Sequence, residues 1–552
     1  MPFEVQHDWQ ASLATPRPLV GERAKTRLLL LLCFLWLSLG LLGHSPWKPD
    51  EAQSISIIKN MMHGGDWAIP AVAGVATLKY PPLYYLTASA SATLLSPWLV
   101  AHEAARLSSG LWMALTLLMV GMAGREMWGT GSGRQTTFIF LGSLGLLYST
   151  HLMIPVVAGL AGYAMAFYGL ALSRRRPWRA GVLLGTGIGI AFLATGLLAA
   201  EILMLTALLL PGFTAWRRRS TAACLLVASL FALPWIAVWL ITLWQRAPDL
   251  LHVWLLNGPH ALDNHSLNFF LKTLIWAAWP ALPLVAWTLW QARSQLWLRP
   301  QFQLTLTFFV VTLLLLGFGA DSRDAQALPL LLPLAILAGS AIDSLRRSLA
   351  SALDWFGIML FGAMGCLVWL GWFAMMMDFP HKLGLRMHKL SPAYLPQFGA
   401  LAVAMACLLT LIWALVVFKT RRSNRAFITD WAVGVTMVWG LLMTLWLPWL
   451  DAAKSYQPMM AELQQSLPEH FACISSRNLG DSQRGLLDYY AGIRTRPFES
   501  NRRIDCDLLL LQDDRGRTPV DPGPSWRLLW QGKRAADRRE SFRLFQRMDQ
   551  RS

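Results

Sequence analysis

Long apolar stretches, separated by short polar and often basic segments, fill the first 450 residues of the chain. A helix needs about 20 apolar residues to cross a bilayer, and a helix satisfies its own backbone hydrogen bonds in lipid. The pattern therefore predicts an α-helical polytopic membrane protein with about thirteen transmembrane helices. These are expected near 28–42, 106–123, 136–150, 155–172, 180–213 (two helices), 222–243, 271–291, 303–318, 326–343, 354–377, 397–418 and 428–449.

Basic clusters between the apolar stretches predict how the helices are oriented. With thirteen crossings every cluster falls on one side, which the positive-inside rule identifies as the cytoplasm. The N-terminus is then expected to be cytoplasmic and the C-terminus to lie on the outer side of the membrane. The clusters are Arg174, Arg175, Arg176 and Arg179; Arg217, Arg218 and Arg219; Arg346 and Arg347; and Lys419, Arg421, Arg422 and Arg425.

Composition supports this interpretation. Hydrophobic residues make up 55% of the chain and charged residues only 14%, whereas soluble proteins carry nearer a quarter charged residues. The formal net charge of +17 belongs largely to the clusters that set topology, so it does not indicate nucleic-acid binding.

The pattern changes at about Asp451. Short apolar segments at 471–476, 506–513, 526–533 and 541–548 predict strands, and 482–493 predicts a helix between the first two. We therefore expect two domains, a membrane domain at 1–450 and a small periplasmic α/β domain at 451–552. Cys473 and Cys506 are the cysteines of the second domain, and an oxidising periplasm would allow a disulfide between them. Their spacing alone does not establish one.

The outer loop at 44–97 carries the first candidate site. Asp50 and Glu51 follow the first apolar stretch and begin a segment with the pattern of an amphipathic helix on the membrane surface. A carboxylate at the interface can accept a proton as a general base. Anionic residues also suit a helix N-terminus, so a capping role explains the same pair.

Further candidates lie on the predicted outer side, where polar residues such as Asp321, Arg323 and Asp324 also recur. Lys79 could hold a phosphate or simply snorkel at the interface. Arg106 could bind a lipid phosphate or pair with Glu103 at i, i+3 spacing. His260, Asp263 and His265 are weak candidates for a divalent metal, because their spacing matches no recognised site.

The stretch from "PDEAQ" through "GGDWAIPAVAGVATLKYPPLYYLTASA" to "AARLSSGLW" resembles bacterial glycosyltransferase family 39-type proteins. These include the lipid A aminoarabinose transferases and, more distantly, protein O-mannosyltransferases. The resemblance continues at 187–196, "WPALPL" at 279–284 and "SRDAQALPLLLPLAILAG" at 322–339. It implies a GT-C fold and inverting transfer of a sugar from a polyprenyl-phosphate donor to a glycolipid, glycan or protein acceptor on the periplasmic face.

The resemblance also implies roles for individual residues. Asp50 matches the family's proposed base, with Glu51 beside it, and Pro81–Pro82 match the Pro–Pro pair that normally follows Glu–Lys. Here Lys79–Tyr80 precede the prolines, so the glutamate is missing and the lysine is displaced by one position. Lys79, Tyr80, Arg106, Asn257 and His265 are the candidates to contact the lipid phosphate.

Three further departures reduce the expected charge. Pro155–Val156 stand where the family has Thr–Asp, and Thr195–Gly196 stand where it has Lys–Gly. In the outer loop before the eighth helix the family has an asparagine and an arginine that reach the phosphate, but here no arginine occurs between Arg246 and Arg293. Three interpretations follow. The chain is an active transferase in which Lys79, Arg106 and His265 substitute; a weakened relative that binds a lipid-linked sugar or a partner; or a transporter of lipid-linked sugars.

Overall fold

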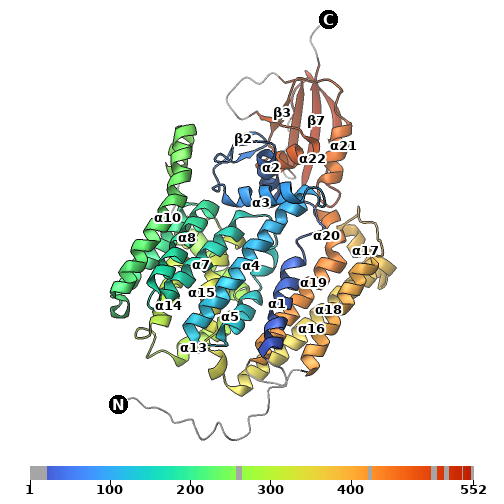
Figure 1. Cartoon of the computed structure of the whole chain (residues 1–552). Helices are drawn as coiled ribbons and strands as arrows, with labels where there is room; N and C mark the ends of the chain where they lie inside the picture. The colour runs from blue at the N-terminus through green and yellow to red at the C-terminus, as the bar shows by residue number, and fades with distance from the viewer. Residues whose placement is uncertain are drawn as a thin grey trace, which may run out of the picture.

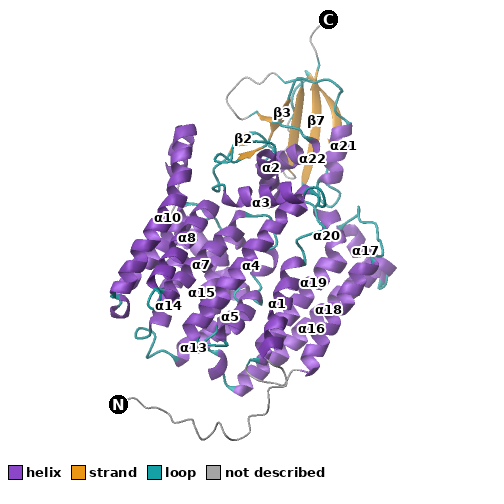
Figure 2. Cartoon of the chain, viewed as in Figure 1, coloured by secondary structure: helices purple, strands orange, loops and turns teal. Residues whose placement is uncertain are grey.

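A bundle of long helices carries a β-sheet region on one of its ends (Figures 1 and 2). The computed structural model describes residues 22–256, 264–419, 425–498, 506–514, 521–537 and 539–548. Within these residues, eight helices are long and apolar enough to cross a membrane, or up to nine if a bent pair is one span. The predicted class of polytopic helical membrane protein is confirmed, while the count of thirteen spans stays a prediction.

Each apolar stretch that the sequence pointed to contains a helix. The helices are α1 (Glu22–Ser38), α4 (Ala101–Trp128), α5 (Ser132–Leu141), α7 (Pro155–Leu172), α8 (Pro177–Thr195), α9 (Leu197–Leu209), α10 (Arg219–Arg246), α12 (Asn264–Ala277), α13 (Ala281–Gln291), α14 (Pro300–Gly319), α15 (Leu328–Ala338), α16 (Arg347–Met377), α18 (Ala400–Lys419) and α19 (Ala426–Leu441).

Glycine and proline decide where these helices break. The stretch at 180–213 forms two helices, as predicted, because Gly196 adopts φ +96°, which a residue with a side chain rarely does. The stretch expected as one helix near 271–291 is instead α12 and α13, bent by 99° at a break that contains Pro280. Proline has no N–H to continue the helical ladder. The expected helix at 136–150 is likewise divided, into α5 and the short α6 (Leu146–Ser149).

The segment between α1 and α4 forms α2 (Asp50–Met62), a small hairpin of β1 (Ala71–Val72) and β2 (Val75–Ala76), and α3 (Leu83–Leu95). The predicted helix after Asp50 is therefore confirmed. It does not lie free on a membrane surface, however, because much of it is buried: Ala52 packs in the core of the sheet region, and Ile55, Ile57 and Ile58 pack in a core shared with α3 and α4. Figure 1 shows α2 between the bundle and the sheet.

The C-terminal region contains the predicted strands and helix. Its sheet has the order β4–β3–β5–β7–β6, in which β3 runs parallel to both of its neighbours and the other pairs are antiparallel. Cys473 and Cys506 form a disulfide that joins the starts of β3 and β5. The elements are α20 (Leu447–Lys454), α21 (Gln457–Gln465), β3 (Ile474–Arg477), α22 (Asp481–Ala491), β4 (Arg496–Pro497), β5 (Leu508–Asp514), β6 (Trp526–Gly532) and β7 (Glu540–Arg547).

The sheet region is fastened to α2 through α22. Ser56 Oγ donates to Asp488 Oδ2 at 3.0 Å, and Ser482 Oγ donates to the carbonyl of Pro49 at 2.9 Å. Gly485 allows the close approach, because a Cβ at this position would stand 2.5 Å from the carbonyl oxygen of Ala52. The sheet region thus holds the helix turn that carries Asp50 and Glu51.

Gly485→Ala is expected to loosen this contact. Overpacking a tight interface typically costs about 1–3 kcal/mol, so the thermal midpoint in detergent should fall and limited proteolysis should release the sheet region faster. Gly212→Ala is the control, since a Cβ there meets nothing within 4 Å. Equal behaviour of the two variants would show that the α2–α22 contact is not tight.

Candidate active site

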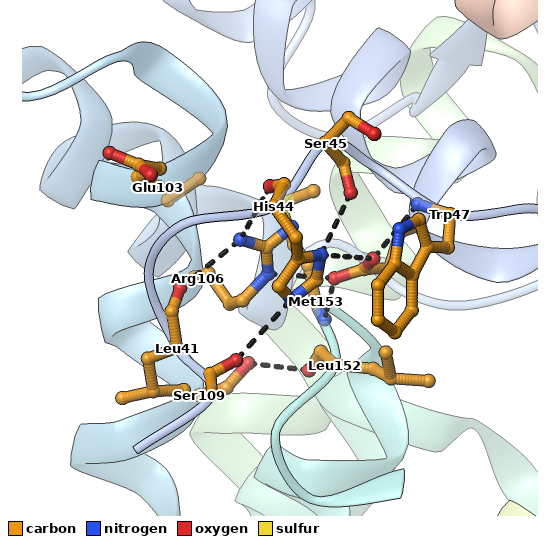
Figure 3. Close-up of polar contacts among 12 residues, drawn as sticks. Leu41, His44, Ser45, Trp47, Glu103, Arg106, Ser109, Leu152 and Met153 are labelled. Carbon is orange, nitrogen blue, oxygen red and sulfur yellow. Dashed lines mark hydrogen bonds and ion pairs between the residues drawn. The ribbon is translucent and has the colours of Figure 1, made fainter. Parts of the chain in front are cut away.

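A buried ion pair stands at the centre of the candidate site. Glu51 and Arg106 both have side chains with 0% exposure, and Arg106 Nε donates to Glu51 Oε1 at 2.8 Å. Glu51 also accepts from the backbone N–H groups of Trp47 at 3.0 Å and Met153 at 2.9 Å (Figure 3). Arg106 donates in addition to the carbonyl oxygens of Leu41 and His44.

These bonds set the ionisation of Glu51. Burial alone would raise the pKa of its carboxyl, but the Arg106 guanidinium and the Trp47 N–H favour the anion and hold the pKa below its ordinary value. Glu51 is therefore an ionised structural residue that joins α2 to α4, to the loop after α1 and to the chain at Met153. Its paired, inaccessible carboxylate is placed to support the site rather than to receive a proton from an acceptor.

The loop that leads to Asp50 is held from a second direction by α20. Asp451 Oδ1 accepts from Ser45 N at 2.9 Å, from Ser45 Oγ at 2.6 Å and from Trp47 Nε1 at 2.9 Å. Lys454, one turn further along α20, lies over the Trp47 ring with Nζ 4.2 Å from its centroid. Contacts from α4 and from α20 therefore fix the residues immediately before α2.

Asp50 has the opposite environment to its neighbour. Its side chain is 30% exposed, and its Oδ1 lies 2.9 Å from Arg323 Nη1 and 3.7 Å from Lys79 Nζ. Burial and Arg323 lower the pKa of Lys79, while Asp50 opposes this change. The carboxylate thus faces two cations from different loops and remains open to solvent.

Two hollows meet beside Asp50. A small cleft is lined by Asp50, Arg323, Pro155 and Val156, and a larger cavity of about 570 Å³ is lined in part by Lys79, Asp321, Thr195, Gly196 and Trp254. Tyr80 and Gln326 line both hollows, and Gln326 Nε2 donates to Tyr80 Oη at 3.2 Å. Burial raises the pKa of Tyr80 to about 12, so its hydroxyl stays protonated.

The structure brings together only some of the residues expected at the site. Lys79 and Tyr80 lie beside Asp50, whereas Arg106 is fully buried against Glu51 and does not line either hollow. The predicted phosphate contact of Arg106 is therefore replaced by a structural one. Its alternative partner, Glu103, instead accepts from the backbone N–H of Gly43.

The loop candidates cannot be placed in the same way. Asn257, His260 and Asp263 lie outside the described residues, and His265 is described only as part of α12. Within the described part of the chain, no group of three or more His, Cys, Asp or Glu side chains is arranged to hold a metal ion. A divalent metal near His260, Asp263 and His265 stays a prediction.

Sequence reasoning missed Arg323, Gln326 and Asp451 as members of the site. The sequence places Arg323 only among several polar residues expected on the outer side, because a separation of 273 residues from Asp50 carries no local signal of their contact. By contrast, the departures at Pro155–Val156 and Thr195–Gly196 prove to be walls of the two hollows. Positions at which this chain departs from the family pattern therefore help to shape the site.

Comparison with known proteins finds similar transferases. No protein-family model matches the chain. An undecaprenyl phosphate-alpha-4-amino-4-deoxy-L-arabinose arabinosyl transferase from Pseudomonas paraeruginosa is 27% identical over 385 residues, which cover 62% of this chain and 64% of that protein. One of the same name from Serratia proteamaculans is 24% identical over 470 residues, covering 81% of this chain and 78% of the relative. The first alignment thus spans less than two thirds of its relative.

Solved structures show the fold. ArnT from Cupriavidus metallidurans bound to undecaprenyl phosphate matches with a TM-score of 0.65 at 15% identity, covering 94% of this chain and 97% of ArnT. The archaeal oligosaccharyltransferase AglB from Archaeoglobus fulgidus matches with a TM-score of 0.50 at 11% identity, covering 86% of this chain and 64% of AglB. The chain has the GT-C fold of these glycosyltransferases, as expected.

The Glu51–Arg106 pair predicts a non-additive pattern of stability. Glu51→Gln or Arg106→Gln alone should lower the free energy of unfolding by about 3–5 kcal/mol, because each leaves a buried charge without its partner. The double variant Glu51→Leu/Arg106→Met should lower the free energy of unfolding by less than the sum of the two single losses. Chemical denaturation in detergent micelles measures all three.

The half-exposed pair of Asp66 and Arg246 supplies a control, since breaking such a pair costs less than about 1 kcal/mol. The lowered pKa of Glu51 also gives its pairing a pH dependence: the stabilisation is present at neutral pH and is lost as the pH falls through the folded-state pKa. Additive effects at Glu51 and Arg106, or costs as small as those at the control pair, would contradict the buried pairing.

Proposed function

We propose that this chain is an inverting glycosyltransferase that moves a sugar from a polyprenyl-phosphate-linked donor to an acceptor on the periplasmic face of the bacterial inner membrane. The observation that carries the proposal is the position of Asp50, a solvent-accessible carboxylate flanked by Lys79 and Arg323 where two hollows meet. The GT-C fold and the transferase names of the aligned relatives support the same reaction class.

In the proposed reaction, Asp50 accepts the proton of the acceptor's hydroxyl group. The acceptor oxygen forms a bond to the anomeric carbon of the donor sugar, and the bond from that carbon to the phosphate oxygen breaks. The electron pair leaves with the polyprenyl phosphate. Attack from the face opposite to the leaving group inverts the anomeric configuration. The carboxylate's exposure is compatible with this role, whereas Glu51 is sealed in its ion pair.

Lys79 and Arg323 are positioned to compensate the charge that develops on the phosphate. Cations held ready at the place where negative charge appears lower the barrier to such a step. Tyr80 and Gln326 add neutral hydrogen-bonding groups on the wall shared by both hollows. Arg323 thus supplies a cation in a site where Thr195–Gly196 replaces the family's Lys–Gly. Asn257 and His265 remain candidates for further phosphate contacts.

An undecaprenyl phosphate carrying an aminopentose is the first donor to test, since it is named in the aligned relatives. A lipid A-like glycolipid is the first acceptor, with another glycan or a protein as alternatives. The C-terminal region lies on the same end of the bundle as α2, the helix that begins at Asp50 (Figure 1), and would be periplasmic in this orientation.

Asp50→Asn is expected to reduce transfer by at least about 100-fold, because general-base catalysis contributes about 10²–10⁴ in rate. Thermal stability and co-purification of polyprenyl phosphate should be unchanged, as measured by melting and native mass spectrometry. Asp66→Asn, which alters another carboxylate paired with an arginine, is the matched control. Wild-type turnover in Asp50→Asn would remove Asp50 as the base. Retained lipid with no turnover, even in the wild-type protein, would favour the binding-only alternative.

Lys79→Gln and Arg323→Gln are expected to weaken donor binding. A hydrogen bond to a charged group is worth about 1.5–3 kcal/mol, which corresponds to a loss of about tenfold or more in affinity for undecaprenyl phosphate. Arg323→Lys should restore part of the loss, while Arg246→Gln should have no effect because Arg246 does not line either hollow. Unchanged lipid affinity in both test variants would place the phosphate elsewhere.

A further inference from the structure

The segment that joins α16 to α18 has an unusual charge for its position. It contains α17 (His381–Leu390), which Figure 1 places at the end of the bundle that carries the sheet region. From Asp378 to Gly399 the sequence contains two lysines and one arginine but a single carboxylate, Asp378, which pairs with His381. In the proposed orientation this segment is periplasmic, where short loops are normally poor in lysine and arginine. The positive-inside rule therefore does not account for these cations.

The cations form a single stripe along α17. Lys382, Arg386 and Lys389 follow one another at i, i+4 and i+7, which places them on one face of the helix, and all three are exposed. Within the described part of the chain, none of them forms an ion pair. The stripe is therefore a row of unneutralised positive charge.

The opposite face of α17 fixes the direction of the stripe. Gly384 and Met387 are buried there, and Trp449 Nε1 of α20 donates to the carbonyl of Met387 at 3.1 Å. Ser391, just after the helix, donates to the carbonyl of Trp449. Since the buried face is held against the protein, the basic stripe must point away from it.

Exposed apolar side chains flank the stripe. Leu385 and Leu390 are 55% and 59% exposed, and Phe379 before the helix and Leu395 and Phe398 after it are also exposed. A short helix with basic residues and exposed leucines, set between the ends of two membrane spans, has the composition of an interfacial helix. Water does not favour exposed leucines. A lipid surface favours both features, because its phosphate groups attract the basic residues and its acyl chains take up the apolar ones.

We propose that α17 is an interfacial helix whose basic stripe binds the phosphate headgroups of anionic phospholipids in the membrane leaflet nearest Asp50. Charge complementarity selects anionic over zwitterionic headgroups, and the flanking apolar residues enter the acyl boundary. Lipid binding by α17 requires that α16 and α18 span the membrane in the proposed orientation, and it does not require the transfer reaction.

The test uses full-length protein with Leu385→p-benzoylphenylalanine, in nanodiscs that contain equal amounts of phosphatidylglycerol and phosphatidylcholine. After irradiation, mass spectrometry counts the lipid adducts at this position. Each cation near an anionic surface contributes enough attraction that phosphatidylglycerol adducts should exceed phosphatidylcholine adducts by roughly fivefold or more. Adding Lys382→Gln, Arg386→Gln and Lys389→Gln should bring the two yields close together.

A matched variant separates the stripe from net charge. Arg527→Gln, Lys533→Gln and Arg539→Gln remove the same charge from exposed positions of the sheet region, and should leave the lipid preference intact. Melting temperatures confirm that each protein is folded, and the single variant Arg386→Gln should give an intermediate preference. Equal preferences in the stripe variant and the wild type, or the absence of lipid adducts at position 385, would overturn the proposal.

Discussion

The buried ion pair between Glu51 and Arg106 is the constraint on which the candidate site depends. Two charges removed from water cost several kcal/mol each, and the cost is offset only when further hydrogen bonds complete the geometry. Here the backbone of Trp47, Met153, Leu41 and His44 supplies them. The pair therefore fixes four parts of the chain at once. Asp50 is the residue before Glu51, so the pair also fixes the backbone position of Asp50, while the Asp50 carboxylate remains accessible to solvent.

A second layer of support comes from the C-terminal part of the chain. Asp451 holds the loop before α2, and α22 covers the first turns of α2 through Ser482 and Gly485. Trp449 links α20 in turn to α17. These contacts connect the sheet region and the proposed lipid-binding helix to the residues that carry Asp50. The sheet region thus contributes to positioning, although the described residues give it no metal cluster of its own.

The sequence predicted the membrane class, the apolar helices, the strands of the C-terminal region and the candidates Asp50, Lys79 and Tyr80, because these features have local patterns. It did not predict that adjacent carboxylates would have opposite roles, since burial of Glu51 depends on α4 and on the chain at Met153. Nor could spacing indicate that Arg323 meets Asp50 or that Asp451 holds Ser45. Such contacts arise only when distant segments pack together.

The separate roles of Asp50 as the base and Glu51 as a structural residue can be tested directly by cryo-electron microscopy of the full-length protein with bound undecaprenyl phosphate. The account predicts that the phosphate lies within hydrogen-bonding distance of Lys79 or Arg323, beside Asp50, with the Glu51–Arg106 pair unbroken. A phosphate bound instead by Arg106, with Glu51 released into the cavity, would contradict the account.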